Sequence, residues 1–549
     1  MSVLKKNTSK FAFSLIAVAI LAGCDSTTTQ NETQEKRSAH TTQANADQPS
    51  YRVGECRIDS MPPLANVRYT EAQRSDTHCI VRGVIEREIH FQVTLPDDWN
   101  GMFAQSGGGG FVGSVVDVIH LATRDKRYAT AGTDSGHRAH ALESNWAAQN
   151  PYREERLANF AGRATHLTTQ NAKQIIASYY QQESQRNLFF GCSRGGGEGL
   201  IAAQRYPTDY DVIVAGSPAY DYAIQTGGLH AAIARKMFPN PDNMQHAIVG
   251  AKEIELVNRT AAQQCANRDG RDSEVLSEPW NCHIDFAALQ CSADKNDDCL
   301  TGDQIEVFDL VFNGLRDSQG NVLAEGFYVG AGVEMFNKWL AGGLAINDLS
   351  QFQSGVTIDP DMKPPVTPSF GYAFGNGIMR NFVFDGEFDA TSYNFDNLRK
   401  DGAKVTESIS AVNPDLSAFR QQGGKLLLWN GLRDVAVTPA STIRYYQDVL
   451  AHDPKAANDV ALFLLPGMDH CSGGAAPWIV DWIDEANLWL DSGNAPTEII
   501  AHDFTPAEGL SGNGKICAFP MSPCGTVRET CTVPIASAAK PLSKRNSAK

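Results

Sequence analysis

The chain has 549 residues, of which 42% are hydrophobic and 20% charged. This length corresponds to roughly two to four domains of ordinary size, which excludes a single small domain. The chain carries 47 Lys and Arg against 63 Asp and Glu, a net charge of −16. Because nucleic-acid binding needs clustered Lys and Arg, we expect no nucleic-acid partner.

The first residues have the pattern of a bacterial export signal. Lys5 and Lys6 precede the apolar run 11–21, which is about half as long as a membrane-spanning helix. The run ends in LAGC, with Cys24 where a bacterial lipobox places its lipidated cysteine. We predict a lipoprotein signal at 1–23, a lipid anchor on Cys24 as the only membrane contact, and a periplasmic or outer-surface location. The alternative is an ordinary signal peptide cleaved nearby.

The remaining chain reads as a tether followed by alternating strands and helices. Residues 24–50 are polar, as in a disordered tether. The strands that we predict, in chain order, are 85–95, 102–105, 128–134, 187–191, 212–215, 425–429 and 460–465, and the helices are 157–180, 199–206 and 439–450. Strands that alternate with helices indicate an α/β fold with a parallel sheet. The pattern loosens between 221 and 420, which we interpret as an insertion.

A serine lies in the sharp turn between the predicted strand 187–191 and the helix that follows it. The sequence around it, GCSRG, matches Gly-x-Ser-x-Gly and places Ser193 at the centre. In such a turn the small residues let the serine rise above the sheet edge, at a helix N-terminus. We predict that Ser193 is a nucleophile. The alternative is a glycine-rich turn with an incidental serine.

A serine needs a base, and the base needs an acid to orient it. Asp434 follows the predicted strand 425–429, and His470 follows the predicted strand 460–465. The order Ser, Asp, His is the order of a hydrolase triad built on a parallel sheet. Asp469 competes as the acid, but a side chain adjacent to His470 cannot easily reach Nδ1. The alternative for Asp434 and His470 is a structural or surface role.

Two cysteines flank the proposed nucleophile and base. Cys192 precedes Ser193, and Cys471 follows His470. A serine and a histidine within hydrogen-bond reach, about 3 Å, bring their neighbours within the distance that a disulfide tolerates. We therefore predict a disulfide between Cys192 and Cys471, with two free buried cysteines as the alternative.

The combination Cys-Ser, then Asp, then His-Cys resembles the tannase/feruloyl esterase family of serine esterases. The resemblance covers nearly all of residues 51–535, and its other shared motifs are 99–101, the glycine run 107–110, 133–137, 203–207, 299–301 and 466–474. It implies an α/β-hydrolase core with a large inserted lid. Members of the family cleave tannic and gallate esters, feruloyl esters or mono(2-hydroxyethyl) terephthalate.

The resemblance divides the chain into domains and completes the expected site. We expect residues 51–220 and 421–549 to form a discontinuous catalytic domain, and 221–420 to form the lid. The oxyanion hole combines the backbone N–H of Arg194 with that of Gly109 or Gly110, since glycine lets an amide approach the substrate closely. The alternative for the glycine run is a flexible loop.

Family members often bind structural calcium in a lid loop reading Cys-Asp-x-x-Asp-Gly-x-x-Asp. In the matching loop, which begins at Cys265, only Asp269 falls on a carboxylate position. Calcium needs six to eight oxygen ligands, several of them charged. We therefore expect no calcium in this loop, and the alternative is a structural calcium around Asp269 with Asn267 and Asp272 as substitute ligands. The serine mechanism itself requires no cofactor.

The other cysteines fall into local pairs, as in an oxidising compartment. The pairs that we expect are Cys56–Cys79, Cys265–Cys282, Cys291–Cys299 and Cys517–Cys531. This leaves Cys524 unpaired or exchanging with a C-terminal partner, because connectivity does not follow from sequence.

These features predict an exported serine carboxylic-ester hydrolase that cleaves small aromatic acid esters of the feruloyl or galloyl type through an acyl-enzyme. Phe382 and Phe384 are candidates to stack on the substrate ring, and Arg380 could pair with a substrate carboxylate. Lid-core packing and plain solvent exposure are the alternatives for these residues. The activity could instead be directed at mono(2-hydroxyethyl) terephthalate or at a non-aromatic ester. From another class, the chain could be a non-catalytic surface-anchored binding protein on a hydrolase scaffold.

Overall fold

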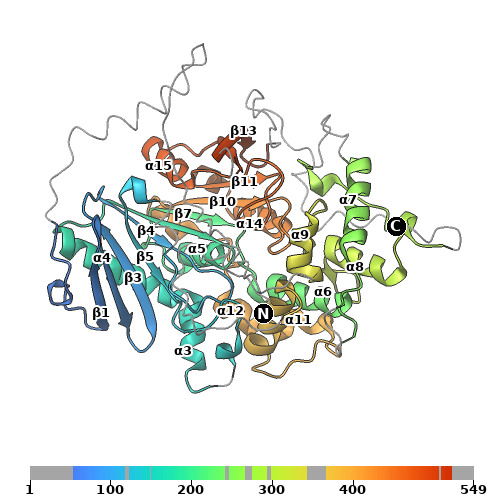
Figure 1. The fold of residues 1–549 in the computed structure, drawn as a ribbon, viewed down its shortest axis with the longest axis horizontal. Coiled ribbons are helices and arrows are strands. Elements are labelled where there is room, and N and C mark those ends of the chain that lie inside the picture. The colour runs from blue at the N-terminus through green and yellow to red at the C-terminus, as the bar shows by residue number, and fades with distance from the viewer. Residues whose placement is uncertain are drawn as a thin grey trace, which may run out of the picture. The chain divides into compact units, whose positions relative to one another are not determined.

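The computed structural model describes residues 53–117, 123–148, 150–240, 246–265, 275–292, 298–342, 367–505 and 509–521 (Figure 1). Its contacts define a large compact unit, Tyr51–Asp503 with Gly512–Lys549, and a small one, Met1–Ser50 with Phe504–Ser511. The fold and the site belong to the large unit. The predicted signal, the anchor on Cys24 and the tether lie outside the described residues.

A nine-stranded sheet organises the large unit, in the order β1-β2-β3-β5-β4-β6-β7-β10-β11. The strands are β1 (Val67–Arg74), β2 (His78–Ile85), β3 (Ile89–Pro96), β4 (Met102–Ser106), β5 (Ala129–Thr133), β6 (Arg186–Cys192), β7 (Val212–Gly216), β10 (Lys425–Gly431) and β11 (Val460–Leu465). β1, β2, β3 and β5 pair antiparallel in turn, and from β5 to β11 all pairs are parallel. The predicted parallel α/β sheet is confirmed.

Two predicted elements need correction. The single strand expected at 85–95 is the hairpin between β2 and β3, which turns at the charged residues 86–88, with Glu86 at φ 52°. The helix expected at 157–180 is interrupted. A short helix α3 (Arg153–Ala158) and a π-helical turn precede α4 (Ala164–Tyr180), and the break lies at Gly162, with φ 110°. A Cβ at Gly162 would lie 2.5 Å from Ile201, so close packing on the neighbouring helix favours glycine there.

Helices cover both faces of the sheet because its central strands are apolar on both sides. Leu426 and Leu428 of β10 pack with α4, α5 (Arg194–Arg205) and α14 (Pro439–His452). Leu427 and Trp429 point to the opposite face, where α15 (Trp482–Ser492) packs. Continuous apolar strands of this kind are typical of buried parallel sheets. The result is a sheet between two helical layers, the α/β-hydrolase arrangement.

The segment 221–420 is mainly helical and lies beside the sheet, at the green to orange end of the molecule in Figure 1. Its helices are α6 (Leu229–Met237), α7 (Ala251–Cys265), α8 (Gly302–Asn313), α9 (Val333–Phe336), α10 (Phe370–Gly377), α11 (Leu398–Asp401), α12 (Ala403–Ile409) and α13 (Ser417–Gln421), with the strands β8 (Leu315–Arg316) and β9 (Val322–Ala324). Phe374 and Phe382 share one apolar cluster with Phe111 and Phe160 from the loops and helices around the sheet. The boundaries of the lid remain a prediction.

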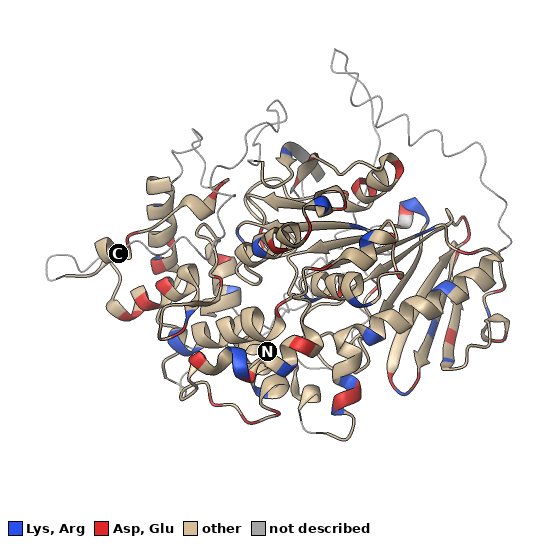
Figure 2. Ribbon diagram, turned by 180° about the vertical axis from the view of Figure 1, so that it is seen from behind, with Lys and Arg blue, Asp and Glu red and all other residues tan. Residues whose placement is uncertain are grey.

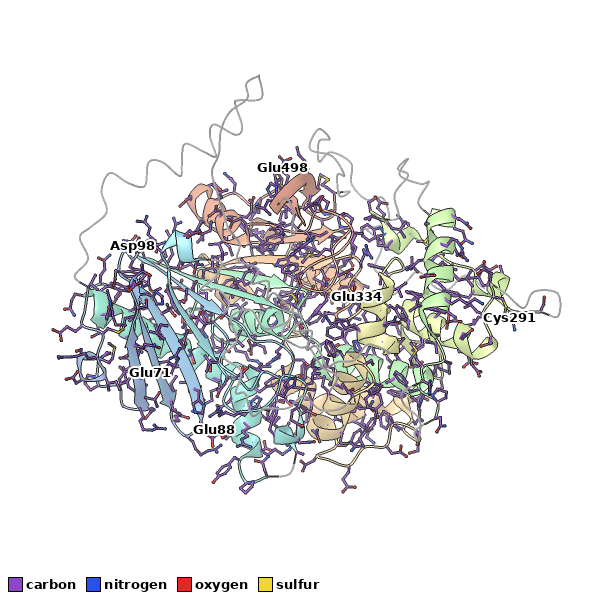
Figure 3. All side chains as sticks on the ribbon, in the orientation of Figure 1. Glu71, Glu88, Asp98, Cys291, Glu334 and Glu498 are labelled. Carbon is purple, nitrogen blue, oxygen red and sulfur yellow. A yellow bond between two sulfur atoms is a disulfide. The ribbon has the colours of Figure 1, made fainter. Side chains whose placement is uncertain are left out.

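Disulfides join four of the predicted pairs, namely Cys56–Cys79, Cys192–Cys471, Cys265–Cys282 and Cys291–Cys299. Figure 3 shows Cys291 near the outer edge of the segment 221–420. Cys517, at the end of the hairpin β12 (Glu498–Thr505) and β13 (Gly509–Cys517), is also disulfide-bonded. Its predicted partner Cys531 and the remaining Cys524 lie outside the described residues.

Acidic and basic residues are interspersed along the helices and strands, as the view from behind shows (Figure 2). Within the described ranges, none of the helices is both long enough and apolar enough to cross a membrane.

Candidate active site

Ser193 occupies a strained turn between β6 and α5. Its backbone has φ 62° and ψ −122°, outside the usual regions for an L-residue, and its N–H donates to Gly216 O at 3.0 Å. A Cβ at Gly191 would collide with the backbone of Gly195, so the turn is tight enough to require glycine. The predicted strand, turn and helix around Ser193 are present. The helix expected at 199–206 begins earlier, at Arg194.

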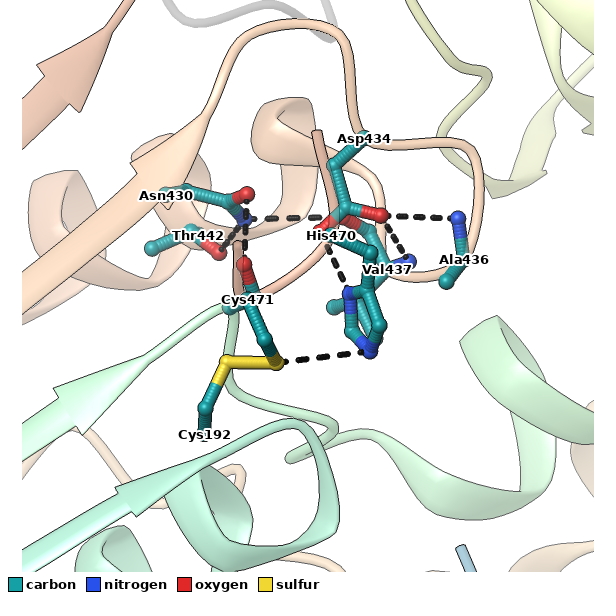
Figure 4. The surroundings of a disulfide bond; sticks show 9 residues. Cys192, Asn430, Asp434, Ala436, Val437, Thr442, His470 and Cys471 are labelled. Carbon is teal, nitrogen blue, oxygen red and sulfur yellow. Dashed lines mark hydrogen bonds and ion pairs between the residues drawn. A yellow bond between two sulfur atoms is a disulfide. The ribbon is translucent and has the colours of Figure 1, made fainter. Parts of the chain in front are cut away.

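Asp434 and His470 meet at the ends of β10 and β11. His470 Nδ1 lies 2.7 Å from Asp434 Oδ2, as Figure 4 shows. Asp434 is fully buried, and its Oδ1 accepts the N–H groups of Ala436 at 2.7 Å and Val437 at 2.9 Å. Since a carboxylate only accepts hydrogen bonds, Nδ1 carries the ring proton and Nε2 is left as the basic atom.

Asp469, the competing acid, faces another partner. Its Oδ1 lies 3.4 Å from Arg433 Nε, and its N–H donates to Gly473 O. Burial raises the pKa of Asp469 to about 6, in spite of the nearby Arg433 guanidinium. The geometry therefore assigns the contact with His470 Nδ1 to Asp434.

The disulfide Cys192–Cys471 joins the serine turn to the histidine loop. The two Cα atoms lie 5.9 Å apart, and Cys471 Sγ is 3.6 Å from His470 Nε2 (Figure 4). Each cysteine is the chain neighbour of Ser193 or His470, so the bond holds the serine turn and the histidine loop together at one edge of the sheet.

A concave space has Ser193 at its wall. Gly110 and Ala436 contribute from the loops around the sheet and Arg194 from the start of α5, while Tyr222, Trp339 and Phe374 contribute from the inserted segment. The Trp339 ring packs against the His470 ring, with centroids 5.1 Å apart and planes at 77°. The space is therefore a mainly apolar pocket with three aromatic rings in its wall, and Trp339 joins it to the Asp434–His470 pair.

The glycine run 107–110 borders this pocket and presents free amides. Four N–H groups in and directly after the run donate hydrogen bonds within the protein, those of Gly107, Gly108, Phe111 and Val112. In the described part of the chain, the N–H groups of Gly109 and Gly110 have no protein acceptor. Gly110 has φ 57°, and a Cβ there would collide with Ala141 O, so this position favours glycine.

The backbone of Arg194 lies at the pocket, and its guanidinium is buried in the interior. It is the first residue of α5, where N–H groups have no partner within the helix. The guanidinium is buried over the Phe160 ring, 4.0 Å from the centroid, and donates to Phe160 O.

The residues expected to bind substrate do not line this pocket. Phe382 is buried among Phe111, Trp146, Phe160 and Tyr222. Phe384 stacks on Phe388, and Arg380 is exposed, with Nη2 donating to Phe388 O at 3.4 Å. Phe382 packs on rings from outside the inserted segment, and Phe384 packs within it; contact of the three residues with substrate stays a prediction.

Sequence reasoning missed the aromatic residues that do form the walls. Trp339 lies in the π-helix Asn337–Ala341, and Phe374 in α10. Both elements are apolar on several sides, so their sequences give no signal for which ring faces the pocket. Asp269, Asn267 and Asp272 of the proposed calcium loop lie outside the described residues. In the part of the chain that the structure describes, no group of three or more His, Cys, Asp or Glu side chains is arranged to hold a metal ion.

Comparisons with known proteins agree with this architecture. A sequence model of the family "Tannase and feruloyl esterase" matches residues 76–535. The mono(2-hydroxyethyl) terephthalate hydrolase of Piscinibacter sakaiensis is 28% identical over 507 residues, covering 81% of each protein. A probable feruloyl esterase of Arthroderma benhamiae is 28% identical over 453 residues, covering 78% of each.

The fold has solved counterparts. The crystal structure of feruloyl esterase B from Aspergillus oryzae superposes with a TM-score of 0.71 and 22% identity, covering 85% of this chain and 95% of that one. Tannin acyl hydrolase from Aspergillus niger superposes with a TM-score of 0.65 and 20% identity, covering 86% and 92%. The chain therefore belongs to the tannase and feruloyl esterase family and is a carboxylic ester hydrolase with the α/β-hydrolase fold.

Proposed function

We propose that this protein is an exported serine esterase that cleaves esters of aromatic acids with the triad Ser193, His470 and Asp434. The observation that carries the proposal is the 2.7 Å contact between His470 Nδ1 and Asp434 Oδ2, on a loop bonded through Cys471 to the neighbour of Ser193. A buried carboxylate that orients a histidine beside a strained serine is the arrangement that nucleophilic ester cleavage requires.

The proposed reaction proceeds through an acyl-enzyme. Ser193 Oγ attacks the ester carbonyl carbon while His470 Nε2 takes the hydroxyl proton, and the carbonyl electron pair moves to oxygen. The N–H groups of Arg194 and of Gly110 or Gly109 stabilise that oxyanion. The carbon–oxygen bond to the alcohol then breaks, and the alcohol leaves with the proton from His470.

Water completes the cycle. It attacks the acyl-enzyme and gives a proton to His470 Nε2. The bond to Ser193 Oγ then breaks, and the serine regains its proton as the free acid leaves. Asp434 holds the imidazole in place and stabilises its charged form. The Ala436 and Val437 amides that bond its Oδ1 support this role, since they fix the carboxylate towards His470.

The walls of the pocket support an aromatic acid as substrate. Tyr222, Trp339 and Phe374 offer ring faces and edges to an acyl ring. Within the described lining, Arg194 is the only Lys or Arg, and its Nε lies 3.9 Å from Glu198 Oε1. Because that charge already has a counter-ion, the pocket favours an uncharged ring of the feruloyl or galloyl type over an acyl group that bears a second carboxylate.

The disulfides support export, because such bonds persist in oxidising compartments. The lipid anchor on Cys24 stays part of the proposal.

Initial rates on four substrates test the function. We expect methyl ferulate and methyl gallate to give higher kcat/KM than mono(2-hydroxyethyl) terephthalate and methyl butyrate. Ser193→Ala should lower kcat by about 10⁴-fold or more on each, as for other serine nucleophiles. A wild-type protein that cleaves none of the four, or a Ser193→Ala variant with wild-type activity, would contradict the proposal.

A further inference from the structure

We propose that Glu198 is a positioning residue that fixes the oxyanion hole, by bonding the glycine run to the helix that begins after Ser193. This inference rests on the proposed function. The carboxylate of Glu198 is buried and takes no part in the reaction. Its role is to align the backbone amides that bind the oxyanion.

The carboxylate of Glu198 bridges three segments that meet beside the pocket. Its Oε2 accepts the N–H of Gly108 at 2.8 Å, and its Oε1 accepts the hydroxyl of Ser135 at 3.2 Å. Oε1 also lies 3.9 Å from Nε of Arg194, one helical turn earlier in α5. Glu198 and Arg194 are only 2% and 1% exposed, so these contacts are shielded from water.

Backbone bonds from Gly107 N–H to Phe190 O and from Phe111 N–H to Ala141 O hold the two ends of the glycine run, and the bond to this carboxylate holds Gly108 between them. The run lies directly on the first turn of α5, where a Cβ at Gly107 would come within 2.5 Å of the Gly195 Cα. Two glycine backbones in contact have no side chains to lock their register. The bond from Gly108 N–H to Glu198 supplies that lock one residue before the free amides of Gly109 and Gly110.

Two buried charges are a poor means of stabilising this part of the molecule. Burial raises the pKa of Glu198 and lowers the pKa of Arg194, since each charge is removed from water. Nε and Nη1 of Arg194 have no hydrogen-bond partner among the described residues. Buried ion pairs rarely stabilise more than apolar side chains of equal size. The contacts of Glu198 therefore point to geometry as its contribution.

The variants Glu198→Ala and Glu198→Gln test the proposal on methyl ferulate. Loss of the carboxylate lets the glycine amides shift, and loss of one oxyanion donor costs about 10²–10³-fold in kcat. We expect Glu198→Ala to lower kcat by about 10²-fold with KM within threefold of wild type. The variant should also weaken the binding of benzeneboronic acid, which mimics the tetrahedral intermediate when bound, by a similar factor. Glu198→Gln keeps one acceptor oxygen and the shape of the side chain, so its kcat should be about tenfold higher than that of Glu198→Ala.

Asp209→Ala is the matched control. Asp209 is equally buried and accepts from His166 at 2.7 Å and Gln170 at 3.0 Å, near the other end of α5. This variant should lose thermal stability with kcat within threefold of wild type. A Glu198→Ala kcat within threefold of wild type, or a loss no greater than that of Asp209→Ala, would overturn the proposal.

If Glu198→Ala does not fold, Glu198→Gln decides: a kcat reduced at least fivefold at unchanged KM supports the positioning role, and a kcat within twofold of wild type rejects it. Failure of the proposed function is separate, because it is read from Ser193→Ala. An inactive Ser193→Ala beside a fully active Glu198→Ala would reject only the role of Glu198.

Discussion

Hydrogen bonding, and not nearness in sequence, decides which aspartate contacts His470 and is the proposed acid. Two aspartates lie close to His470, one adjacent in the chain and one on the loop after β10. Asp434 accepts from Nδ1 at 2.7 Å, while Asp469 lies beside Arg433 at 3.4 Å. The side chain of a residue adjacent to the histidine points away from the ring, so the more distant aspartate holds it.

Asp434→Asn should lower kcat by about 10³–10⁴-fold, because an amide at this position favours the wrong imidazole tautomer. The matched control is Asp469→Asn, which should keep kcat within a few-fold of wild type. Steady-state hydrolysis of methyl ferulate measures both variants. Equal losses in the two would show that Asp434 is not the orienting acid.

Asp469 also predicts a pH dependence of stability. Burial raises its pKa from 3.8 to about 6, so the folded protein keeps a proton that the unfolded chain releases near pH 4. The free energy of unfolding should therefore fall as pH rises from 4 to 6, by about 2 kcal/mol relative to Asp469→Asn. Urea denaturation of both proteins at pH 4, 5, 6 and 7 measures the difference. A difference that stays constant or grows with pH would contradict the raised pKa.

The sequence predicts the positions of Ser193, Asp434 and His470 because each follows an apolar strand, and the carboxyl ends of parallel strands meet at one edge of a sheet. It could not predict the pocket walls. Whether Phe374 or Phe382 faces the substrate depends on how the inserted helices pack on Phe111 and Phe160, and these contacts are distant in sequence.

The strand order explains why a disulfide is placed at the site. Ser193 follows β6 and His470 follows β11, with β7 and β10 between them. Three strand spacings amount to about 14 Å, yet the Cα atoms of Cys192 and Cys471 are 5.9 Å apart. The loop after β11 must therefore fold back across two strand ends, and the disulfide holds it there.

Replacing Cys192 and Cys471 with serine should lower both kcat and stability. The bond spans 279 residues, against 8 for Cys291–Cys299, so its loss should cost on the order of 5 kcal/mol, about twice the cost for the short loop. The Cys291→Ser/Cys299→Ser protein is the control, with kcat within twofold of wild type. Activity and urea midpoints at 15 °C measure both effects. An unchanged kcat in the first variant would show that the loop keeps its place without the bond.

The misjudged hairpin and helix have local causes. Ile85 and Ile89 flank three charged residues, and the alternation of apolar residues continues through the turn, so a single strand was expected. Glu86 takes a positive φ there, which few non-glycine residues do. The helix break at Gly162 depends on contact with Ile201, a residue on another helix.

The inserted segment and the sheet form one compact unit. Phe111, Trp146 and Phe160 pack with Ile378 and Phe382 in a single buried cluster. The sequence predicts an insertion from its loose pattern, but a shared core depends on contacts between distant residues, which one sequence does not display.

A shared core predicts a single cooperative unfolding transition. Differential scanning calorimetry at neutral pH should show one peak, and tryptophan fluorescence and far-UV circular dichroism should give coincident midpoints. Phe382→Ala should lower that midpoint as a whole, because it removes a ring from the shared cluster. A separate early transition of the segment 221–420 would contradict this expectation.

The central claim is that Ser193 is an activated nucleophile. A fluorophosphonate probe tests it most directly, because serine Oγ displaces fluoride only when a neighbouring base takes its proton. Peptide mass spectrometry should find one adduct, on the peptide that contains Ser193, in the wild-type protein, and none in Ser193→Ala or His470→Ala. A wild-type protein without the adduct, or an adduct that persists in His470→Ala at the wild-type rate, would contradict the triad.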